Sequence, residues 1–158
     1  MNVPSTQSAR SGLPDGKLHS DAVSFAWPVR VYWEDTDAGG VVYHARYLAF
    51  MERARSEWLR AHDVHQDDLR EGEDLVFAVR AMEVDFRAPA RLDDQLRVSV
   101  RLLESRGASF AVAQRVERGG ALLVEARVRI AALRASDFRP RPIPDFLSDI
   151  LKNLLETQ

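Results

Sequence analysis

The sequence predicts an α+β fold, in which one long helix covers one face of an antiparallel sheet. Two observations lead to this prediction. Between residues 45 and 62 the apolar residues recur at helical spacing, whereas from residue 77 to residue 133 they mostly alternate with the period of two typical of strands. Because the two patterns occupy separate stretches of the chain, the helix and the sheet must bury their apolar faces against each other.

A first strand is predicted at residues 25–33, FAWPVRVYW, where Pro28 places the start of the strand near a sheet edge. The helix of residues 45–62 follows. Its apolar side consists of Tyr47, Phe50, Met51, Ala54, Trp58 and Ala61. The other side is mostly charged, so the helix has a single stripe to bury. Residues 62–74 form a polar connection with room for one short helical turn.

The next strand contains a change of phase. Two apolar sets alternate in opposite phases, first Phe77, Val79 and Ala81, and then Met82, Val84 and Phe86. A slip by one residue within a strand predicts a β-bulge or a sharp bend.

Further strands bring the predicted sheet to about five. Alternating runs at residues 96–102 and 110–116 are followed by Gly119-Gly120, a two-residue hairpin turn, and by a long apolar run at residues 121–133. Residues 145–156 predict a C-terminal amphipathic helix. Its apolar stripe consists of Phe146, Leu147, Ile150, Leu151, Leu154 and Leu155. Such a stripe must cover the chain's own sheet or that of a partner.

The composition excludes several classes of function. The 158 residues carry a formal net charge of −2 without a polybasic block, which argues against a nucleic-acid partner or an anionic membrane surface held by charge. The chain has no cysteines, so disulfides, thiolate metal sites and a cysteine nucleophile are excluded. No apolar run approaches the ~18 residues of a membrane span, and we expect no membrane insertion.

The first part of the chain differs from the rest in composition. Residues 1–24 are polar, rich in Ser, Gly and Pro, and lack the apolar run of a signal peptide. We therefore expect a disordered N-terminal tail at residues 1–24, a single domain at residues 25–158, and a cytoplasmic location.

Three carboxylates, Glu34, Asp35 and Asp37, crowd into four residues just before the long helix. A calcium loop that began at Asp35 would require a side-chain ligand at Gly39 and a bidentate Glu at Arg46, so a calcium site is excluded. The segment also lacks the Lys and Ser/Thr of a phosphate-binding loop. The G-x-S-x-G pattern of a serine-hydrolase nucleophile elbow is absent as well.

Two histidines, His62 and His65, lie three residues apart in the polar connection. Histidines in such a segment are usually solvated, and the sequence therefore predicts no metal site.

The start of the long helix adds a second chemical group to the acidic segment. No Ser, Thr, Asp or Asn lies directly before Arg46 to cap the first backbone N–H groups. Such groups are capped by water or offered to a ligand oxygen, and the helix dipole favours negative charge there. With Asp37 beside them they would form a carboxylate and an oxyanion hole, the minimal equipment for thioester hydrolysis. The alternative is that Asp35 and Asp37 only form the turn, by bonding their own backbone.

The run VRVYWEDTDAGGVVYHARYLAFMERAR, residues 29–55, closely resembles the active-site segment of the 4-hydroxybenzoyl-CoA thioesterase family, nearest to its Tol–Pal-associated acyl-CoA thioesterase branch. The likeness continues through residues 77–94 and covers nearly all of residues 25–140. It implies a hotdog fold, in which a curved antiparallel sheet wraps a long central helix, and assembly into homodimers or homotetramers. It also implies hydrolysis of an acyl-CoA without metal or cofactor. The sequence leaves open whether CoA or acyl-carrier protein carries the acyl group.

The resemblance assigns roles to several residues. Asp37 falls on the family's catalytic aspartate, which acts as nucleophile or general base, and His44 falls on the histidine characteristic of this branch. The backbone N–H at the helix entrance corresponds to the group that polarises the thioester carbonyl. Trp33 departs from the pattern, which usually has a tyrosine there, so a hydroxyl at this position is expected to be dispensable.

Other positions have two interpretations each. Tyr43 and Tyr47 are candidates for lining an acyl pocket, although Tyr47 also fits the core. Arg91, Arg106 and Ser109 are candidates for contacts with the CoA phosphates, with ordinary surface positions as the alternative.

Two rival functions stay open. A non-catalytic acyl-CoA-binding hotdog domain would have no need of Asp37. A hotdog dehydratase or hydratase would use a histidine and an acid elsewhere on the scaffold, with a proline-rich entrance that is absent before this helix. Other hotdog branches use a carboxylate on the central helix, but here Glu52 is expected on the solvated side.

Overall fold

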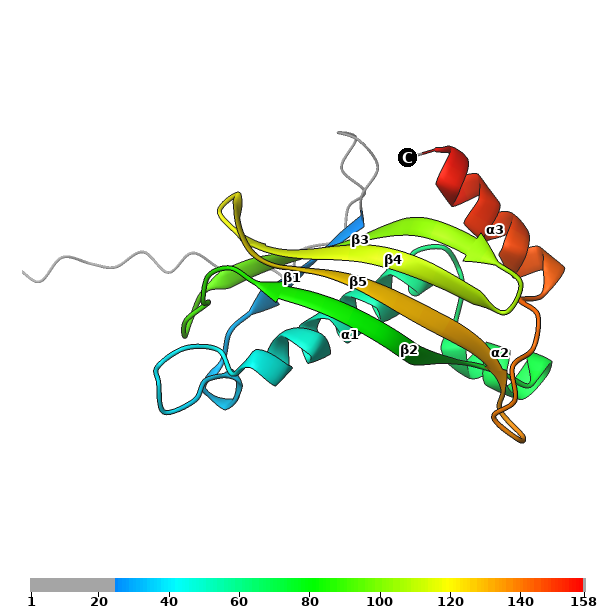
Figure 1. The fold of residues 1–158 in the computed structure, drawn as a ribbon, viewed down its shortest axis with the longest axis horizontal. Helices are drawn as coiled ribbons and strands as arrows, with labels where there is room; N and C mark the ends of the chain where they lie inside the picture. Colours follow the sequence, from blue (N-terminus) through cyan, green and yellow to red (C-terminus); the bar gives the residue numbers. More distant parts are fainter. Residues whose placement is uncertain (1–24, 158) are drawn as a thin grey trace, which may run out of the picture.

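The computed structural model describes residues 25–157, so the predicted tail at residues 1–24 lies outside the described residues. One antiparallel sheet of five strands has the order β1-β3-β4-β5-β2. The strands are β1 (Phe25–Arg30), β2 (Leu75–Phe86), β3 (Gln95–Arg106), β4 (Ser109–Arg118) and β5 (Ala121–Arg134). The long helix α1 (His44–Arg60) lies along one side of the curved sheet (Figure 1). The predicted α+β architecture of about five strands around a long helix is confirmed.

Helix α1 buries the stripe that its sequence pattern indicates. The buried residues are Tyr47, Phe50, Met51, Ala54, Trp58 and Leu59. Ala61 was expected in this stripe but is exposed, because the helix ends at Arg60 and Leu59 takes the last inward position. Each large apolar side chain that is fully buried contributes about 1.5–3 kcal/mol to folding, so this stripe is a main part of the core.

Strand β1 ends at Arg30, three residues earlier than the sequence pattern suggests. Val31 pairs instead with the loop before β3, where its N–H donates to the carbonyl oxygen of Asp94 at 3.0 Å. Residues Trp33–Asp35 then form a 3₁₀ turn, η1. The side chain of Asp35 accepts a hydrogen bond from the N–H of Tyr32 at 2.9 Å, which draws the chain out of the strand direction.

The bulge and the hairpin turn lie where the sequence predicts them. The register between β2 and β5 shifts between Val79 and Ala81, so the phase change in β2 is a bulge. Gly119 and Gly120 have φ angles of +55° and +83°. Two successive positive φ angles are typical of the type I′ hairpin turn, which matches the twist of the flanking strands.

Two further helices complete the fold. Helix α2 (Gln66–Glu73) is longer than the single turn expected in the polar connection, and Leu69 anchors it in the core. Helix α3 (Asp145–Glu156) covers the predicted C-terminal segment and packs against β3. Its residues Leu147 and Leu151 are buried, whereas other parts of the expected stripe stay exposed. None of the helices between residues 25 and 157 is long and apolar enough to cross a membrane.

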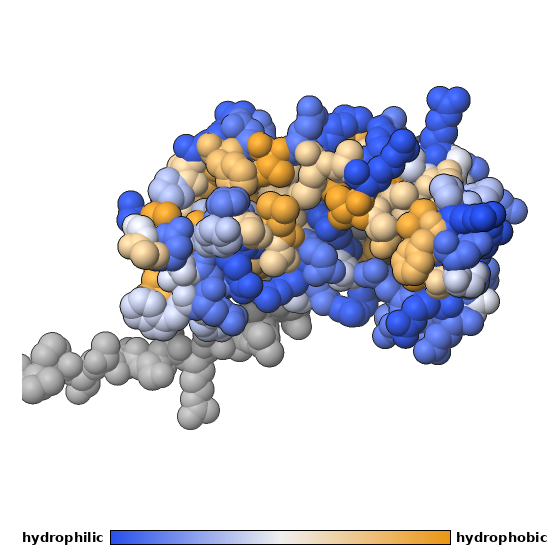
Figure 2. Space-filling view, turned by 60° about the horizontal axis from the view of Figure 1, so that its bottom comes forward, coloured by the Kyte–Doolittle hydropathy of each residue, from blue (hydrophilic) through white to orange (hydrophobic). Residues whose placement is uncertain are grey.

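Strand β2 is an edge of the sheet and no described strand pairs with its outer side. Exposed apolar side chains lie on β2 and α1, with Val79 at 49%, Phe86 at 48% and Leu48 at 38% exposure. Figure 2 turns the lower side of Figure 1 forward, and apolar residues gather there in patches between charged ones. This uncovered edge is the longer of the two, since β2 has 12 residues and β1 has 6.

Candidate active site

The acidic segment is a short hairpin loop that presents Asp37 near the start of α1. An isolated antiparallel bridge joins Thr36 to Val42, and the N–H of Asp37 donates to the carbonyl oxygen of Val41 at 3.0 Å. Gly40 has a φ of +74°, a conformation that a residue without Cβ adopts readily. The loop therefore has a defined shape, and it leads directly into the helix.

Gly39 holds the carboxylate of Asp37. The N–H of Gly39 donates a hydrogen bond of 2.8 Å to Oδ1 of Asp37. A Cβ at residue 39 would lie 3.0 Å from the same oxygen, so a larger residue would displace it. The side chain is exposed, and Oδ2 has no hydrogen-bond partner within residues 25–157. One oxygen is thus fixed while the other faces solvent, where a substrate or a water molecule can reach it.

Asp35 has a different environment, although it is only two residues away. It is 2% exposed, and its Oδ1 accepts hydrogen bonds from Nε and Nη2 of Arg46 at 2.8 and 2.6 Å. Its Oδ2 accepts from the N–H of Tyr32. Asp35 therefore ties the 3₁₀ turn to the first turn of α1. Both acids accept a local backbone hydrogen bond, as the turn-forming alternative describes, but only Asp37 keeps an oxygen that faces solvent.

The first turn of α1 has no side-chain cap. Tyr43 occupies the N-cap position without a side-chain hydrogen bond, as the sequence predicts. The N–H of Arg46 donates to the carbonyl oxygen of Tyr43 at 2.8 Å, whereas the N–H groups of His44 and Ala45 find no backbone acceptor in the described chain. Such groups point outward along the helix axis and carry the positive end of the helix dipole. They are suited to bind an oxygen that develops negative charge.

Aromatic rings surround the helix entrance. The exposed ring of His44 lies 4.5 Å from that of Tyr43 and 6.4 Å from that of Phe86, measured between centroids. Phe86, at the end of β2, also meets Tyr47 at 5.9 Å. These side chains form an aromatic cluster at the start of α1, the helix into which the Asp37 loop leads. Phe86 was not among the predicted site residues, because only the packing of β2 against α1 brings it there.

Tyr47 belongs to the core and anchors a second loop. It is 3% exposed, and its hydroxyl accepts a hydrogen bond from the N–H of Ala90 at 2.9 Å. Burial raises the pKa of Tyr47 above its ordinary value, although the bond from Ala90 opposes this rise. Ala90 in turn accepts a hydrogen bond from the N–H of Val42 at 2.9 Å. The loop between β2 and β3, which includes the exposed Arg91, is thus held next to the Asp37 loop.

The structure does not bring Arg106 and Ser109 to this site within one chain. They pair with each other at the turn between β3 and β4. The site lies at the opposite end of β3, a strand that spans roughly 36 Å at the usual rise of a β-strand. In Figure 1 this turn and the start of α1 lie at opposite ends of the molecule. Of the predicted substrate-binding residues, Tyr43, Tyr47 and Arg91 lie at the end of the molecule that carries the Asp37 loop.

The two histidines of the polar connection do not meet in a cluster of metal ligands. His62 Nδ1 lies 2.7 Å from the carbonyl oxygen of Trp58, and His65 is exposed at the N-cap of α2. Within the described residues, no group of three or more His, Cys, Asp or Glu side chains could hold a metal ion.

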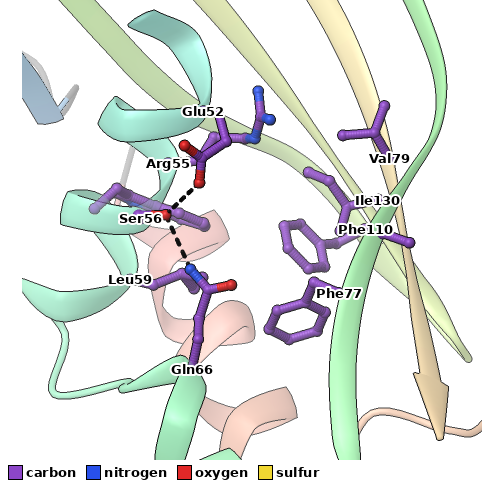
Figure 3. Close-up of a pocket in the computed structure, with 11 residues that line it drawn as sticks. Glu52, Arg55, Ser56, Leu59, Gln66, Phe77, Val79, Phe110 and Ile130 are labelled. Atoms are coloured by element: carbon purple, nitrogen blue, oxygen red, sulfur yellow. Dashed lines mark hydrogen bonds between the residues drawn. The ribbon is translucent and has the colours of Figure 1, made fainter. Parts of the chain in front are cut away.

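A pocket of about 110 Å³ lies between α1 and the sheet, and Figure 3 shows its lining. We call it the α1–β2 pocket. One wall is polar and consists of Glu52, Arg55 and Ser56 of α1 and Gln66 of α2; the other is apolar and consists mainly of Phe77, Val79, Phe110 and Ile130.

The polar wall of the α1–β2 pocket is ordered by hydrogen bonds. The hydroxyl of Ser56 donates to Oε1 of Glu52 at 2.8 Å and accepts from Nε2 of Gln66 at 3.0 Å. Glu52 is exposed, as expected, but it also lines this pocket. The helical pattern of α1 gave no sign of a pocket here, because it depends on how α2 and β2 pack against the helix.

Comparisons with known proteins agree with this architecture. Residues 31–151 match the thioesterase-like superfamily. The acyl-CoA thioester hydrolase YbgC of Escherichia coli O6:H1 is 49% identical over 121 residues, which are 76% of this chain and 90% of the relative. The acyl-CoA thioesterase YbgC of Haemophilus influenzae is 45% identical over 120 residues, 76% of this chain and 88% of the relative.

Solved structures share the fold. The crystal structure of a probable thioesterase from Bartonella henselae is 41% identical, with a TM-score of 0.74 over 77% of this chain and 100% of that chain. A 1,4-dihydroxy-2-naphthoyl-CoA thioesterase from Synechocystis has a TM-score of 0.76 at 22% identity, over 83% and 97% of the two chains, a likeness of fold alone. The expected hotdog fold is confirmed. Since the superfamily match extends over most of the chain and the YbgC proteins are similar along nearly their whole length, the chain belongs to the thioesterase-like superfamily.

Proposed function

We propose that this protein hydrolyses the thioester bond of an acyl-CoA and releases the free acid and CoA. The observation that carries the proposal is that the loop of Asp37 leads directly into the uncapped start of α1. Asp37 has one oxygen fixed by Gly39 and one oxygen that faces solvent, and the first turn of α1 has no side-chain cap. The names of the YbgC relatives, acyl-CoA thioester hydrolase and acyl-CoA thioesterase, support the same chemistry.

In this proposal the thioester carbonyl oxygen accepts a hydrogen bond from the backbone N–H of His44. Charge that develops on this oxygen is stabilised by the N–H and by the helix dipole. Asp37 then acts in one of two ways. Its free oxygen takes a proton from a water molecule that attacks the carbonyl carbon, or it attacks that carbon itself and forms an anhydride that water opens. In both cases the bond from carbon to sulfur breaks and CoA leaves as the thiolate.

We propose further that two chains pair through β2. An uncovered edge strand offers unpaired N–H and C=O groups to a second chain, and β2 is long and carries the exposed Val79 and Phe86. A closed dimer would bury this edge by a two-fold axis. The α1–β2 pocket reaches the β2 edge at Val79. In the dimer the partner chain would therefore lie at the mouth of this pocket, and each active site would use residues of both chains.

The test is a panel of acyl-CoA thioesters of increasing chain length, with and without an aromatic ring, in which the released CoA thiol is measured. The same acyl group on acyl-carrier protein identifies the preferred carrier. Turnover of at least one thioester that depends on Asp37 is the expected result. Binding of acyl-CoA without release of thiol would favour the non-catalytic hotdog domain and contradict the proposal.

A further inference from the structure

Arg55 is the least expected group in the α1–β2 pocket, because it is a cation on the wall of a partly apolar hollow. Its side chain is half-buried. Nη1 donates a hydrogen bond of 2.8 Å to Oε1 of Gln114, a neutral amide. No Asp or Glu oxygen of residues 25–157 lies within 4.0 Å of the Arg55 nitrogens. Burial lowers the pKa of Arg55 below its ordinary value, and the nearby charge of Glu52 opposes this change.

Gln114 fixes the direction of Arg55. Gln114 is fully buried in β4, and its Nε2 donates to the carbonyl oxygen of Met51 at 3.1 Å. This bond orients the amide so that Oε1 points at the guanidinium. Arg55 is therefore held by a buried core residue, it lines the pocket, and its other N–H groups make no hydrogen bond within residues 25–157. A guanidinium carries five donors, so most of them are left for a ligand.

A half-buried cation without a carboxylate partner is costly unless another acceptor reaches it. Resting on the proposed thioesterase function, we propose that Arg55 determines substrate specificity, and that the α1–β2 pocket takes a short aliphatic acyl group with an acceptor oxygen at its far end. The apolar side chains of Phe77 and Phe110 would contact the methylene groups, and Arg55 would donate hydrogen bonds to the oxygen. The pocket of about 110 Å³ is smaller than the 300–1,000 Å³ of sites for drug-sized ligands.

Glu52 determines whether an acyl group that ends in a hydroxyl or one that ends in a carboxylate is the better substrate. Its carboxylate lines the same wall and already accepts a hydrogen bond from Ser56. A terminal hydroxyl accepts from Arg55 and has a proton to donate to Glu52. A terminal carboxylate also accepts from Arg55, but it meets the negative charge of Glu52. The hydroxyl-ended acyl group is therefore the better substrate of the two.

The reacting thioester would lie beside the second chain of the proposed dimer. Arg55 follows His44 by eleven residues, which is roughly 16 Å along the helix axis. A short acyl group cannot span this distance to Asp37 of its own chain. The pocket instead reaches the sheet edge at Val79, so Asp37 of the partner subunit would supply the carboxylate.

The test compares three thioesters with four-carbon acyl groups, butyryl-CoA, 4-hydroxybutyryl-CoA and succinyl-CoA. In the native protein we expect kcat/KM for the two oxygen-bearing substrates to exceed that for butyryl-CoA by about 10- to 100-fold, the range of one hydrogen bond to a charged group. In Arg55→Met this preference should fall to within about twofold of unity. Arg53→Met is the matched control, since Arg53 is exposed on the same helix, and it should keep the preference.

Two further variants keep the test decisive. If Arg55→Met does not fold, Arg55→Gln retains an amide that can bond Gln114 without the charge, and its preference is measured instead. Glu52→Gln should raise kcat/KM for succinyl-CoA relative to 4-hydroxybutyryl-CoA, because the repulsion is removed. Equal ratios in the native protein and the Arg55 variants would overturn the role of Arg55. If the native protein releases CoA from none of the three thioesters, that result would instead speak against the proposed function.

Discussion

The backbone N–H of Gly39 holds Oδ1 of Asp37 at 2.8 Å, and the Cβ of any larger residue at position 39 would lie 3.0 Å from that same oxygen. The carboxylate thus occupies the space that a side chain at residue 39 would need. Two variants can separate the chemical role of the carboxylate from its position. Asp37→Asn replaces the carboxylate by an amide, whereas Gly39→Ala keeps the carboxylate and only moves it.

Asp37→Asn is expected to keep the fold and lose turnover. The amide oxygen of asparagine can still accept the hydrogen bond from Gly39, but it supplies neither a nucleophile nor a base. We expect kcat to fall on the order of 10²–10⁴-fold, as for the loss of a general base. The rate of thiol release measures turnover, and a thermal melt of the same preparation measures whether the fold is kept. An Asn variant within a few-fold of native activity would show that Asp37 has no part in the mechanism.

Gly39→Ala is expected to lower kcat by less than the roughly 10²-fold that a displacement of about 1 Å of a reacting group costs, because the added methyl group requires Oδ1 of Asp37 to move by only a few tenths of an ångström. The carboxylate itself is retained, so the residual activity should keep its dependence on Asp37. Gly72→Ala is the control, since the added methyl group meets no atom within 4 Å apart from the adjacent backbone of its own helix, α2. It should leave kcat unchanged and stabilise the fold by up to about 1 kcal/mol. Native-like turnover of Gly39→Ala would show that the position of Oδ1 is unimportant.

His44→Ala is expected to reduce turnover less than Asp37→Asn. The backbone N–H of residue 44 survives the change, and only the ring contacts with Tyr43 and Phe86 disappear. The two variants should be compared by kcat with one thioester. If His44→Ala is the more damaged of the two, the imidazole is the principal base and the order of roles is reversed. A large drop in melting temperature would point to a structural role for the ring.

Local patterns predict much of this fold, and contacts distant in sequence explain the rest. The bulge after Val79 and the turn at Gly119-Gly120 follow from a change of period and from two glycines, which are visible within a few residues. The contact between Arg55 and Gln114 joins positions 59 residues apart. No pattern in α1 distinguishes Arg55 from a solvated arginine, because the difference comes from the packing of β4 beneath it.

The acidic segment illustrates the same limit within the candidate site. The sequence identifies three crowded carboxylates and an uncapped helix start, and the structure retains both features. It also divides the acids, since Asp35 is buried against Arg46 while Asp37 is exposed. That division depends on the path of the chain between η1 and α1, which composition alone does not determine.

Asp35→Asn is therefore expected to show the opposite behaviour from Asp37→Asn. Arg46 would lose its buried partner charge, since the acid is 2% exposed, and would keep only the exposed Glu34 at 3.8 Å. Breaking a buried pair costs about 3–5 kcal/mol, and we expect the lower end because Arg46 is partly exposed. Chemical denaturation should report this loss, while kcat per folded molecule should fall by less than about tenfold. A stable Asp35→Asn protein without turnover would instead assign Asp35 to the chemistry.

The proposed dimer predicts that two inactive chains can restore activity together. Asp37→Asn removes the acid and leaves the α1–β2 pocket intact, whereas Ser56→Phe fills the pocket and leaves the acid. If each site combines Asp37 of one chain with the pocket of the other, a mixed dimer contains one complete site. Random mixing of equal amounts would then give about a quarter of native activity, since half of the dimers are mixed and half of their sites are complete.

Chains that carry both substitutions, mixed with Asp37→Asn chains, should show no recovery. The mixtures should be unfolded and refolded together so that subunits exchange, and sedimentation should confirm the dimer at the assay concentration. An active monomer in that experiment would sink the shared-site proposal.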